Sequence, residues 1–234
     1  MQFSAVIFDF NGVLLWDSPF HEEAWQTTAL TLRRLRLSEQ EIAEHVHGRP
    51  IAYTLGYLTG RSVVGQELAD LTELKESLYR RLCLEHPERF VLSPGAIPLL
   101  EALEARHVAH TIATSSEITN LRFFVDRLVL ANWFAPRLIV YDDGSMPGKP
   151  APDIYLKAAQ RLGTPPAQCI VVEDSLSGIE AARAAGIGHI IAIGPRERHA
   201  GLRECAGVAE VIESLAEFPL ALVVPGAREA ENSF

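Results

Sequence analysis

The sequence predicts an α/β fold, a doubly wound parallel sheet with a small inserted α-helical domain. Short apolar runs alternate with helical patterns along most of the chain. The runs are continuous rather than alternating, which is typical of parallel strands buried on both faces. Because the connections are short, the strands are expected to join through right-handed crossovers into one Rossmann-like sheet. The segment 18–90 breaks this rhythm, since it contains helical patterns and no convincing strand.

The sheet and its flanking helices are expected from residue 1 to 17 and again from residue 91 to 234. The predicted strands are 5–10, 109–115, 137–143, 169–175 and 189–194, and the predicted helices are 96–106, 117–130, 152–162 and 176–185. Gly186 follows the last of these helices, in the usual position of a left-handed C-terminal cap. The apolar stretch "FPLALVVPG" is expected to form either a last strand or a tail on the core, and the polar residues after Gly226 to be frayed.

The inserted segment 18–90 is expected to form a cap domain. Helical patterns cover 21–37, 38–46 and 68–86. Ser38 with Glu41 three residues later predicts a capping box at a helix start. The hinges between the cap and the sheet domain are expected near Leu15–Ser18 and Pro87–Pro94.

The composition describes an ordinary globular protein and excludes several classes. The 234 residues are 48% hydrophobic, and the net charge is −9. A nucleic-acid binder would usually carry a basic face, so no nucleic-acid partner is expected. No apolar run approaches the ~20 residues needed to span a bilayer, and the N-terminus does not resemble a signal peptide. Three scattered cysteines without CxxC spacing indicate a reducing, cytoplasmic setting, and a monomer is the default expectation.

Polar residues follow four of the predicted strands. The first strand leads to Asp9, the second to Thr114-Ser115-Ser116, the third to Lys149 and the fourth to Glu173-Asp174. In an open parallel sheet, ligands bind beyond the carboxyl ends of the strands. We therefore expect all of these side chains at one crevice.

The charges of this group predict its chemistry. Two carboxylates ~4 Å apart repel by roughly 4 kcal/mol at an effective dielectric constant of 20. A hard cation such as Mg²⁺ would offset this repulsion, and Lys149 supplies a second positive charge. Hydroxyls and helix amides after Thr114 would donate to an anion. A metal, an ammonium and donors around a carboxylate suit a phosphoryl group, with Asp9 as the nucleophile that forms an aspartyl phosphate.

Each residue also has an ordinary structural explanation. An acid or hydroxyl after a strand often caps the next helix, which would account for Asp9, the Thr114–Ser116 run or the Glu173–Asp174 pair. Lys149 alone would be a surface lysine. The functional interpretation depends on their occurrence together, in this order, on successive strands.

These residues resemble the motifs of the haloacid dehalogenase superfamily, in the branch with a helical cap after the first strand. The similar stretches are "FDFNGV", "TIATSS", "GKPAPDIYLKAAQRLG" and "CIVVEDSLSGIEAARAAG", and the resemblance covers roughly residues 3–216. It is nearest to phosphatases and β-phosphoglucomutase-like members. It implies a small phosphorylated metabolite as substrate and Mg²⁺ as cofactor.

The resemblance also implies roles for single residues. Asp9 would be the nucleophile, Thr114 the phosphate-binding hydroxyl, and Asp174 a Mg²⁺ ligand. Further metal ligands would be Glu173, directly or through water, and the main-chain carbonyl of Asn11. In the cap, "HGRP" is similar to the family's substrate loop, so Arg49 is either a substrate contact or a cap arginine paired with a cap acid.

Asn11 departs from the family pattern, because phosphotransferases of the family normally carry a second Asp there as proton donor and base. Asn cannot transfer a proton at neutral pH. Three outcomes are open. A replacement acid such as His21 could take over, although His21 could also be an ordinary helix histidine. Catalysis could instead be slow or restricted to good leaving groups, or the aspartyl phosphate could last, as in a binding or signalling module. A sugar-phosphate mutase is an alternative that Asn11 disfavours. Metal-free dehalogenation is opposed by Glu173-Asp174, and phosphonate hydrolysis would need Lys75, the only cap lysine.

Overall fold

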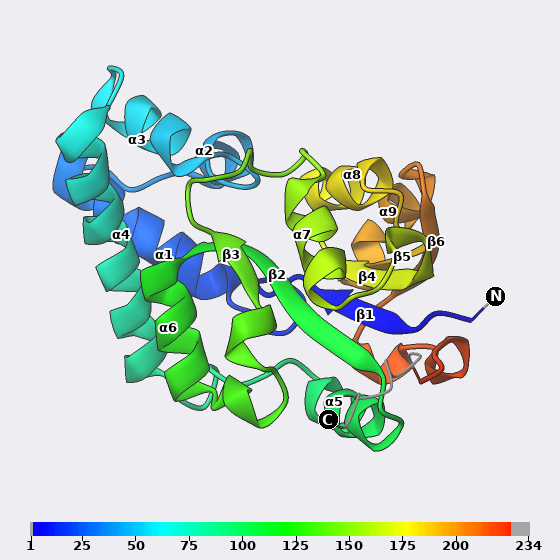
Figure 1. The fold of residues 1–234 in the computed structure, drawn as a ribbon. Helices are drawn as coiled ribbons and strands as arrows, with labels where there is room; N and C mark the ends of the chain where they lie inside the picture. The colour runs from blue at the N-terminus through cyan, green and yellow to red at the C-terminus, as the bar shows by residue number, and fades with distance from the viewer. Residues whose placement is uncertain (1, 226–234) are drawn as a thin grey trace. The chain divides into compact units, whose positions relative to one another are not determined.

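The computed structural model describes residues 2–225 and contains a six-stranded sheet (Figure 1). Its strand order is β3-β2-β1-β4-β5-β6, and all five pairings are parallel. The strands are β1 (Ala5–Phe8), β2 (Ala109–Glu117), β3 (Val140–Asp142), β4 (Cys169–Glu173), β5 (His189–Ile193) and β6 (Val208–Ile212). The predicted α/β fold is confirmed, and β6 is an edge strand that the sequence pattern did not predict.

Two compact units make up the chain. We call Met1–Trp16 with Leu92–Phe234 the core unit and Asp17–Val91 the helical unit. The expected boundaries, 17/18 and 90/91, lie one residue from these. In residues 2–225, no helix is both long and apolar enough to cross a bilayer.

Five helices connect the strands of the core unit. They are α5 (Ala96–Ala105), α6 (Ile118–Arg127), α7 (Asp153–Arg161), α8 (Leu176–Ala184) and α9 (His199–Glu204). Short 3-10 turns lie at Leu130–Asn132, Pro136–Leu138, Pro166–Gln168, Arg196–Arg198, Leu215–Glu217 and Leu220–Leu222. Gly186, which follows the C-cap residue Ala185 of α8, has φ +72°, as its predicted role as a left-handed cap requires.

One apolar cluster of this unit forms between the sheet and α7, α8 and α9. Ala5 and Ile7 of β1, and Val171 of β4, pack with apolar residues of these three helices. Cys169 is buried in the same cluster, where it packs as a small core residue. β1 and β4 are buried along their whole length, which explains their continuous apolar sequence.

The strand register brings the carboxyl ends of β1 and β4 level, whereas β2 continues past them to Glu117. Phe8 of β1 pairs with Ile112 of β2 on one side and with Val172 of β4 on the other. The residues that follow, starting with Asp9, therefore emerge from the same edge of the sheet. At the other end of the chain, Val223 makes a single parallel bridge to Phe3, so the apolar C-terminal stretch is a tail with one bridge. Residues from Gly226 onward lie outside the described part of the chain.

The helical unit consists of α1 (Ser18–Arg33), α2 (Glu39–His45), α3 (Ile51–Thr59) and α4 (Gly65–Glu85). α1 packs along α4, and α3 packs against both. Its apolar core includes Trp25, Leu55 and Leu58. The predicted capping box is confirmed, since Ser38 and Glu41 bond to each other's main-chain amides. α3 was missed because it is short and contains a glycine.

A polar cluster joins α1 and α4 within this unit, formed by the half-buried His21 and the buried residues Asp17, Lys75, Glu76 and Tyr79. The Lys75 ammonium lies 2.9 Å from Glu76 Oε1 and 2.6 Å from His21 Nδ1. Tyr79 donates to Asp17 at 2.5 Å, and its ring stacks on His21. Burial lowers the pKa of Lys75 and outweighs the opposing effect of Glu76. Lys75 is thus a buried, paired lysine.

Because the Lys75–Glu76 pair is buried, removing one partner should destabilise the helical unit strongly. Lys75→Met is expected to lower the free energy of unfolding by about 3–5 kcal/mol, since it removes the ammonium from a buried ion pair. Lys75→Met with Glu76→Gln should recover most of this loss. Urea unfolding measures both effects. The control is Arg81→Met, at an exposed pair with Glu85, which should cost at most ~1 kcal/mol; equal losses at the two sites would contradict the account.

Candidate functional site

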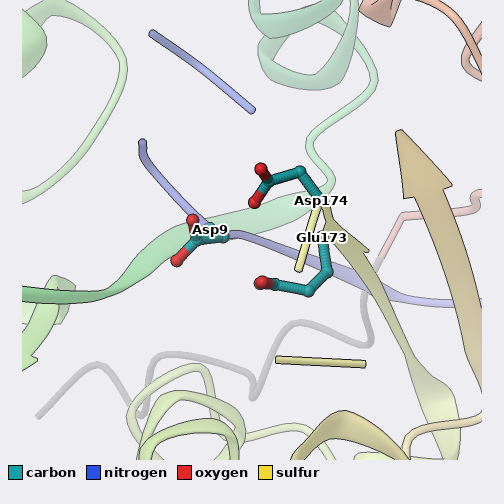
Figure 2. A group of neighbouring side chains, drawn as sticks. All are labelled: Asp9, Glu173 and Asp174. Atoms are coloured by element: carbon teal, nitrogen blue, oxygen red, sulfur yellow. The ribbon is translucent and has the colours of Figure 1, made fainter. Parts of the chain in front are cut away.

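Three carboxylates meet at the carboxyl edge of the sheet. Asp9 directly follows β1, while Glu173 and Asp174 stand at the end of the neighbouring strand β4. One carboxylate oxygen of each lies within 4.8 Å of the others. Figure 2 shows the Glu173 and Asp174 side chains turned toward the side on which Asp9 lies. The structure therefore brings together the acids that the sequence placed on separate strands.

The Lys149 ammonium lies between two of these acids. Its Nζ is 2.6 Å from Asp9 Oδ1 and 3.0 Å from Glu173 Oε2. Only 7% of the Lys149 side chain is exposed. The ammonium also lies 5.1 Å from the centre of the Tyr155 ring. Lys149 is therefore a buried member of the cluster, and the surface-lysine explanation is wrong.

Glu173 is held on both of its oxygens by protein groups. Oε2 accepts from Lys149 and from the Tyr155 hydroxyl, the latter at 2.7 Å. Oε1 accepts from the Ser175 hydroxyl at 2.6 Å. A Cβ at Gly178 would lie 2.0 Å from this carboxylate, so glycine at that position makes room for it. This arrangement fixes Glu173 as the partner that orients Lys149.

Burial and repulsion from neighbouring carboxylates shift the pKa values of Asp174 and Asp9. Burial, and then repulsion from Glu173, raises the pKa of Asp174 to about 7. The same two causes raise the pKa of Asp9 well above its usual value, against the opposing effect of Lys149. Burial disfavours the Lys149 ammonium, but Asp9 and Glu173 outweigh it and raise the lysine pKa. The cluster therefore holds more negative charge than one ammonium can balance.

The donor set fits a hard divalent cation. All three acids offer oxygen ligands, and the excess negative charge favours a doubly charged ion. Asp174 is only partly buried and its carboxylate is next to Asp9, so these two residues have oxygens to offer. Glu173 already accepts four hydrogen bonds, two on each oxygen.

Hydroxyl groups from β2 reach the same edge of the sheet. Thr114 is buried and its Oγ1 accepts from the Ser116 amide at 3.1 Å. Ser116 Oγ donates to the Asn11 side-chain carbonyl at 2.8 Å. Ser115 is exposed. Ser116 thus joins β2 to the loop after β1 through Asn11.

Other residues take the helix-capping roles that these site residues could have had. Glu117 caps α6 by accepting from the amides of Thr119 and Asn120. Ser175 caps α8 by accepting from the Gly178 amide. The hydroxyls of residues 114–116 and the acids at 173 and 174 therefore do not cap these helices.

Gly12 lets the loop after β1 approach the end of β4. Its φ is +82°, and a Cβ there would lie 2.3 Å from Asp174 Oδ2. Only glycine satisfies both conditions without moving the acid. The Asn11–Gly12 turn and Asp174 consequently pack directly against each other.

Two predicted site residues belong to the helical unit. Arg49 is exposed, its Nε donates to the Glu44 carbonyl at 3.0 Å, and its guanidinium lies over the Tyr53 ring. Both ring nitrogens of His21 have partners inside the polar cluster, Lys75 at Nδ1 and Asp17 at Nε2. Their proposed contacts with substrate stay predictions.

Sequence analysis missed Tyr155, Ser175 and the two close-packed glycines. Tyr155 lies on the apolar face of α7, where an aromatic residue is indistinguishable from core. Ser175 carried the better signal, since a serine between an acidic pair and a helix start predicts an N-cap. Arg198, whose guanidinium donates to the Asp174 carbonyl at 2.8 Å, gave no signal in the sequence.

Comparison with known proteins agrees with this geometry. Residues 3–186 match the haloacid dehalogenase-like hydrolase family. Hexitol phosphatase A of Escherichia coli (strain K12) is 32% identical over 193 residues, which cover 82% of this chain and 84% of that protein.

Solved structures are similar over most of their length. A HAD hydrolase of family IA, variant 3, from Entamoeba histolytica superposes with a TM-score of 0.87 and is 36% identical, covering 93% of this chain and 95% of that one. A β-phosphoglucomutase from Clostridium difficile has a TM-score of 0.74 at 22% identity, with 93% of each chain covered. The latter shows a shared fold.

The Tyr155 hydroxyl should stabilise the site through Glu173. Tyr155→Phe is expected to lower the free energy of unfolding by about 1–3 kcal/mol, because it removes a donor from a buried carboxylate. Denaturant unfolding measures the change. Tyr141→Phe, at a half-buried position on β3, is the control and should change stability by at most ~0.5 kcal/mol; a Tyr155→Phe effect no larger than this would show that the bond does not support Glu173.

Proposed function

Because the chain belongs to the haloacid dehalogenase-like hydrolases, we propose that it is a Mg²⁺-dependent phosphatase of a small phosphorylated metabolite. Hydrolysis of phosphate monoesters follows from this family and from relatives such as the hexitol phosphatase. The observation that carries the proposal is the Lys149 ammonium, buried between Asp9 and Glu173 at the sheet edge.

In the proposed reaction Asp9 is the nucleophile. Its carboxylate attacks phosphorus, the bond to the leaving oxygen breaks, and Asp9 becomes an aspartyl phosphate that water then hydrolyses. Lys149 lies within hydrogen-bond distance of Asp9 and would offset the negative charge that gathers as two anions approach. Thr114 and Ser116 would donate hydrogen bonds to phosphoryl oxygens.

We assign the metal to oxygens of Asp9 and Asp174, with the Asn11 main-chain carbonyl as a further ligand. Glu173 would contribute through water, because its own oxygens are already bonded to Lys149, Tyr155 and Ser175. A bound Mg²⁺ would neutralise charge and orient the phosphoryl group.

Asn11 is expected to make this phosphatase slow. General acid–base catalysis is typically worth ~10²–10⁴ in rate, and an amide supplies none of it. The mutase alternative suffers more, because an intramolecular transfer must both protonate and deprotonate a sugar hydroxyl. A module that binds phosphorylated ligands with little turnover is the alternative that Asn11 itself favours.

The helical unit would act as the cap that selects the substrate. Lid-like domains exclude water and add specificity groups when they close. Arg49 and His21 are the candidates for substrate contact in this unit, although His21 would first have to leave Lys75 or Asp17. A monomer in the cytoplasm remains the expectation for the working protein.

A phosphate-release panel tests the proposed activity. Sugar and nucleotide phosphates are incubated with and without Mg²⁺, and we expect metal-dependent release of phosphate that Asp9→Asn abolishes. Asp142→Asn, at an exposed acid on β3, should leave it intact. Release that needs no metal, or that survives in Asp9→Asn, would reject the proposal.

Mg²⁺ affinity should depend on pH in a defined direction. The Asp174 pKa near 7 means that below this pH a proton must leave before the carboxylate can bind metal. Below pH 7 the association constant for Mg²⁺ should thus rise at least about tenfold per pH unit. Above pH 7 it should level off. Isothermal titration calorimetry with Mg²⁺ alone measures this, and a pH-independent affinity below pH 7 would exclude Asp174 as a ligand.

A further inference from the structure

Asn11 stands at the position where the resemblance to the family implies a proton donor for the leaving group. It lies two residues after Asp9, in the turn that packs on Asp174 through Gly12. Ser116 Oγ donates to its Oδ1 at 2.8 Å, which fixes the amide plane at the site edge. An amide can donate and accept hydrogen bonds there, but it holds no proton that it can give up at neutral pH.

The charged residues around Asp9 do not replace this acid. The Lys149 ammonium donates hydrogen bonds to Asp9 at 2.6 Å and to Glu173 at 3.0 Å, so both acids hold it in place. Both oxygens of Glu173 already accept hydrogen bonds from protein donors, two on each oxygen. Asp174 is the metal candidate.

The histidines of the described core unit are also committed elsewhere. His110 and His189 lie near the amino ends of β2 and β5, whereas Asp9 follows the carboxyl end of β1. His110 binds two main-chain carbonyls through its two ring nitrogens. His199 Nε2 binds the Gly194 carbonyl, and His107 precedes β2.

We infer that Asp9 takes its phosphoryl group fastest from acyl phosphates, whose leaving group needs no proton, and only slowly from phosphate esters of alcohols. This inference rests on the proposed function and names the donor class of the same site. A carboxylic acid with a pKa of ~4 leaves as a stable anion at neutral pH, whereas an alkoxide does not. The absence of an acid at position 11 therefore penalises the two donors unequally.

The transfer balances without a proton from the protein. Asp9 Oδ forms a bond to phosphorus, the bond between phosphorus and the acyl oxygen breaks, and the acyl group departs with the electron pair as a carboxylate. Water then attacks the phosphorus of phospho-Asp9, releases the Asp9 carboxylate and yields inorganic phosphate, with the water proton passing to solvent or to the product. Because Asn11 is no base either, this second step is slow, and phospho-Asp9 accumulates.

The test compares acetyl phosphate with glucose 6-phosphate in wild type and Asn11→Asp. Because kcat/KM reports the first, phosphorylating step, the ratio of the two kcat/KM values isolates the leaving group. This ratio should fall by about 10²–10⁴ in Asn11→Asp, since a carboxyl at position 11 helps only the alcohol to leave. With acetyl phosphate, wild type should also release a burst of acetate, the product of the first step. Mass spectrometry should then find a peptide with phosphorylated Asp9. Asp9→Asn should show neither.

A second series of substrates tests the same inference without the Asn11→Asp variant. Wild type alone is assayed with aryl phosphates of similar shape and decreasing leaving-group acidity, from p-nitrophenyl to phenyl phosphate. A steep fall in kcat/KM along the series supports the inference. Similar kcat/KM values along the series, or an unchanged acetyl-to-glucose ratio in a folded Asn11→Asp, would overturn the inference and leave the proposed phosphatase standing. No Asp9-dependent phosphate from any donor would reject the proposed function itself.

Discussion

The Lys149 ammonium, buried between Asp9 and Glu173, is the interaction on which the site depends. A buried cation is tolerated only where anions surround it, and the buried acids in turn need that cation. The supporting contacts follow from this requirement. Tyr155 and Ser175 saturate Glu173, Gly178 leaves space for it, and α7 and α8 supply these groups from the face of the sheet that they cover.

The same arrangement separates two tasks that a phosphatase normally combines. In the proposed reaction, Asp9 and Lys149 would capture a phosphoryl group, and Asp174 would add an oxygen ligand for a divalent cation. Proton transfer to and from the leaving group would depend on position 11, where the chain has an amide held by Ser116. The proposal thus assigns capture and proton transfer to different residues.

The fold and the central site residues could be predicted from the sequence because their signals are local. Continuous apolar runs predicted β1 and β4. An acid or hydroxyl at the end of such a run can be read directly from the order of residues. β6 and α3 were not predicted, because the hydrophobic periodicity of a half-buried edge strand and of a nine-residue helix is weak. Tyr155 escaped because its role comes from a contact 18 residues away, which only the packed structure supplies. The internal partners of His21 and Lys75 were hidden for the same reason.

The most direct measurement of the central claim is a crystal structure of the chain grown with Mg²⁺ and beryllium fluoride, a mimic of a phosphoryl group on aspartate. The account predicts the fluoride complex bonded to Asp9 Oδ, with Lys149 still beside Asp9 and the cation on oxygens of Asp9 and Asp174. An Asp9 that stays unmodified while the cation or the fluoride complex binds elsewhere would contradict it.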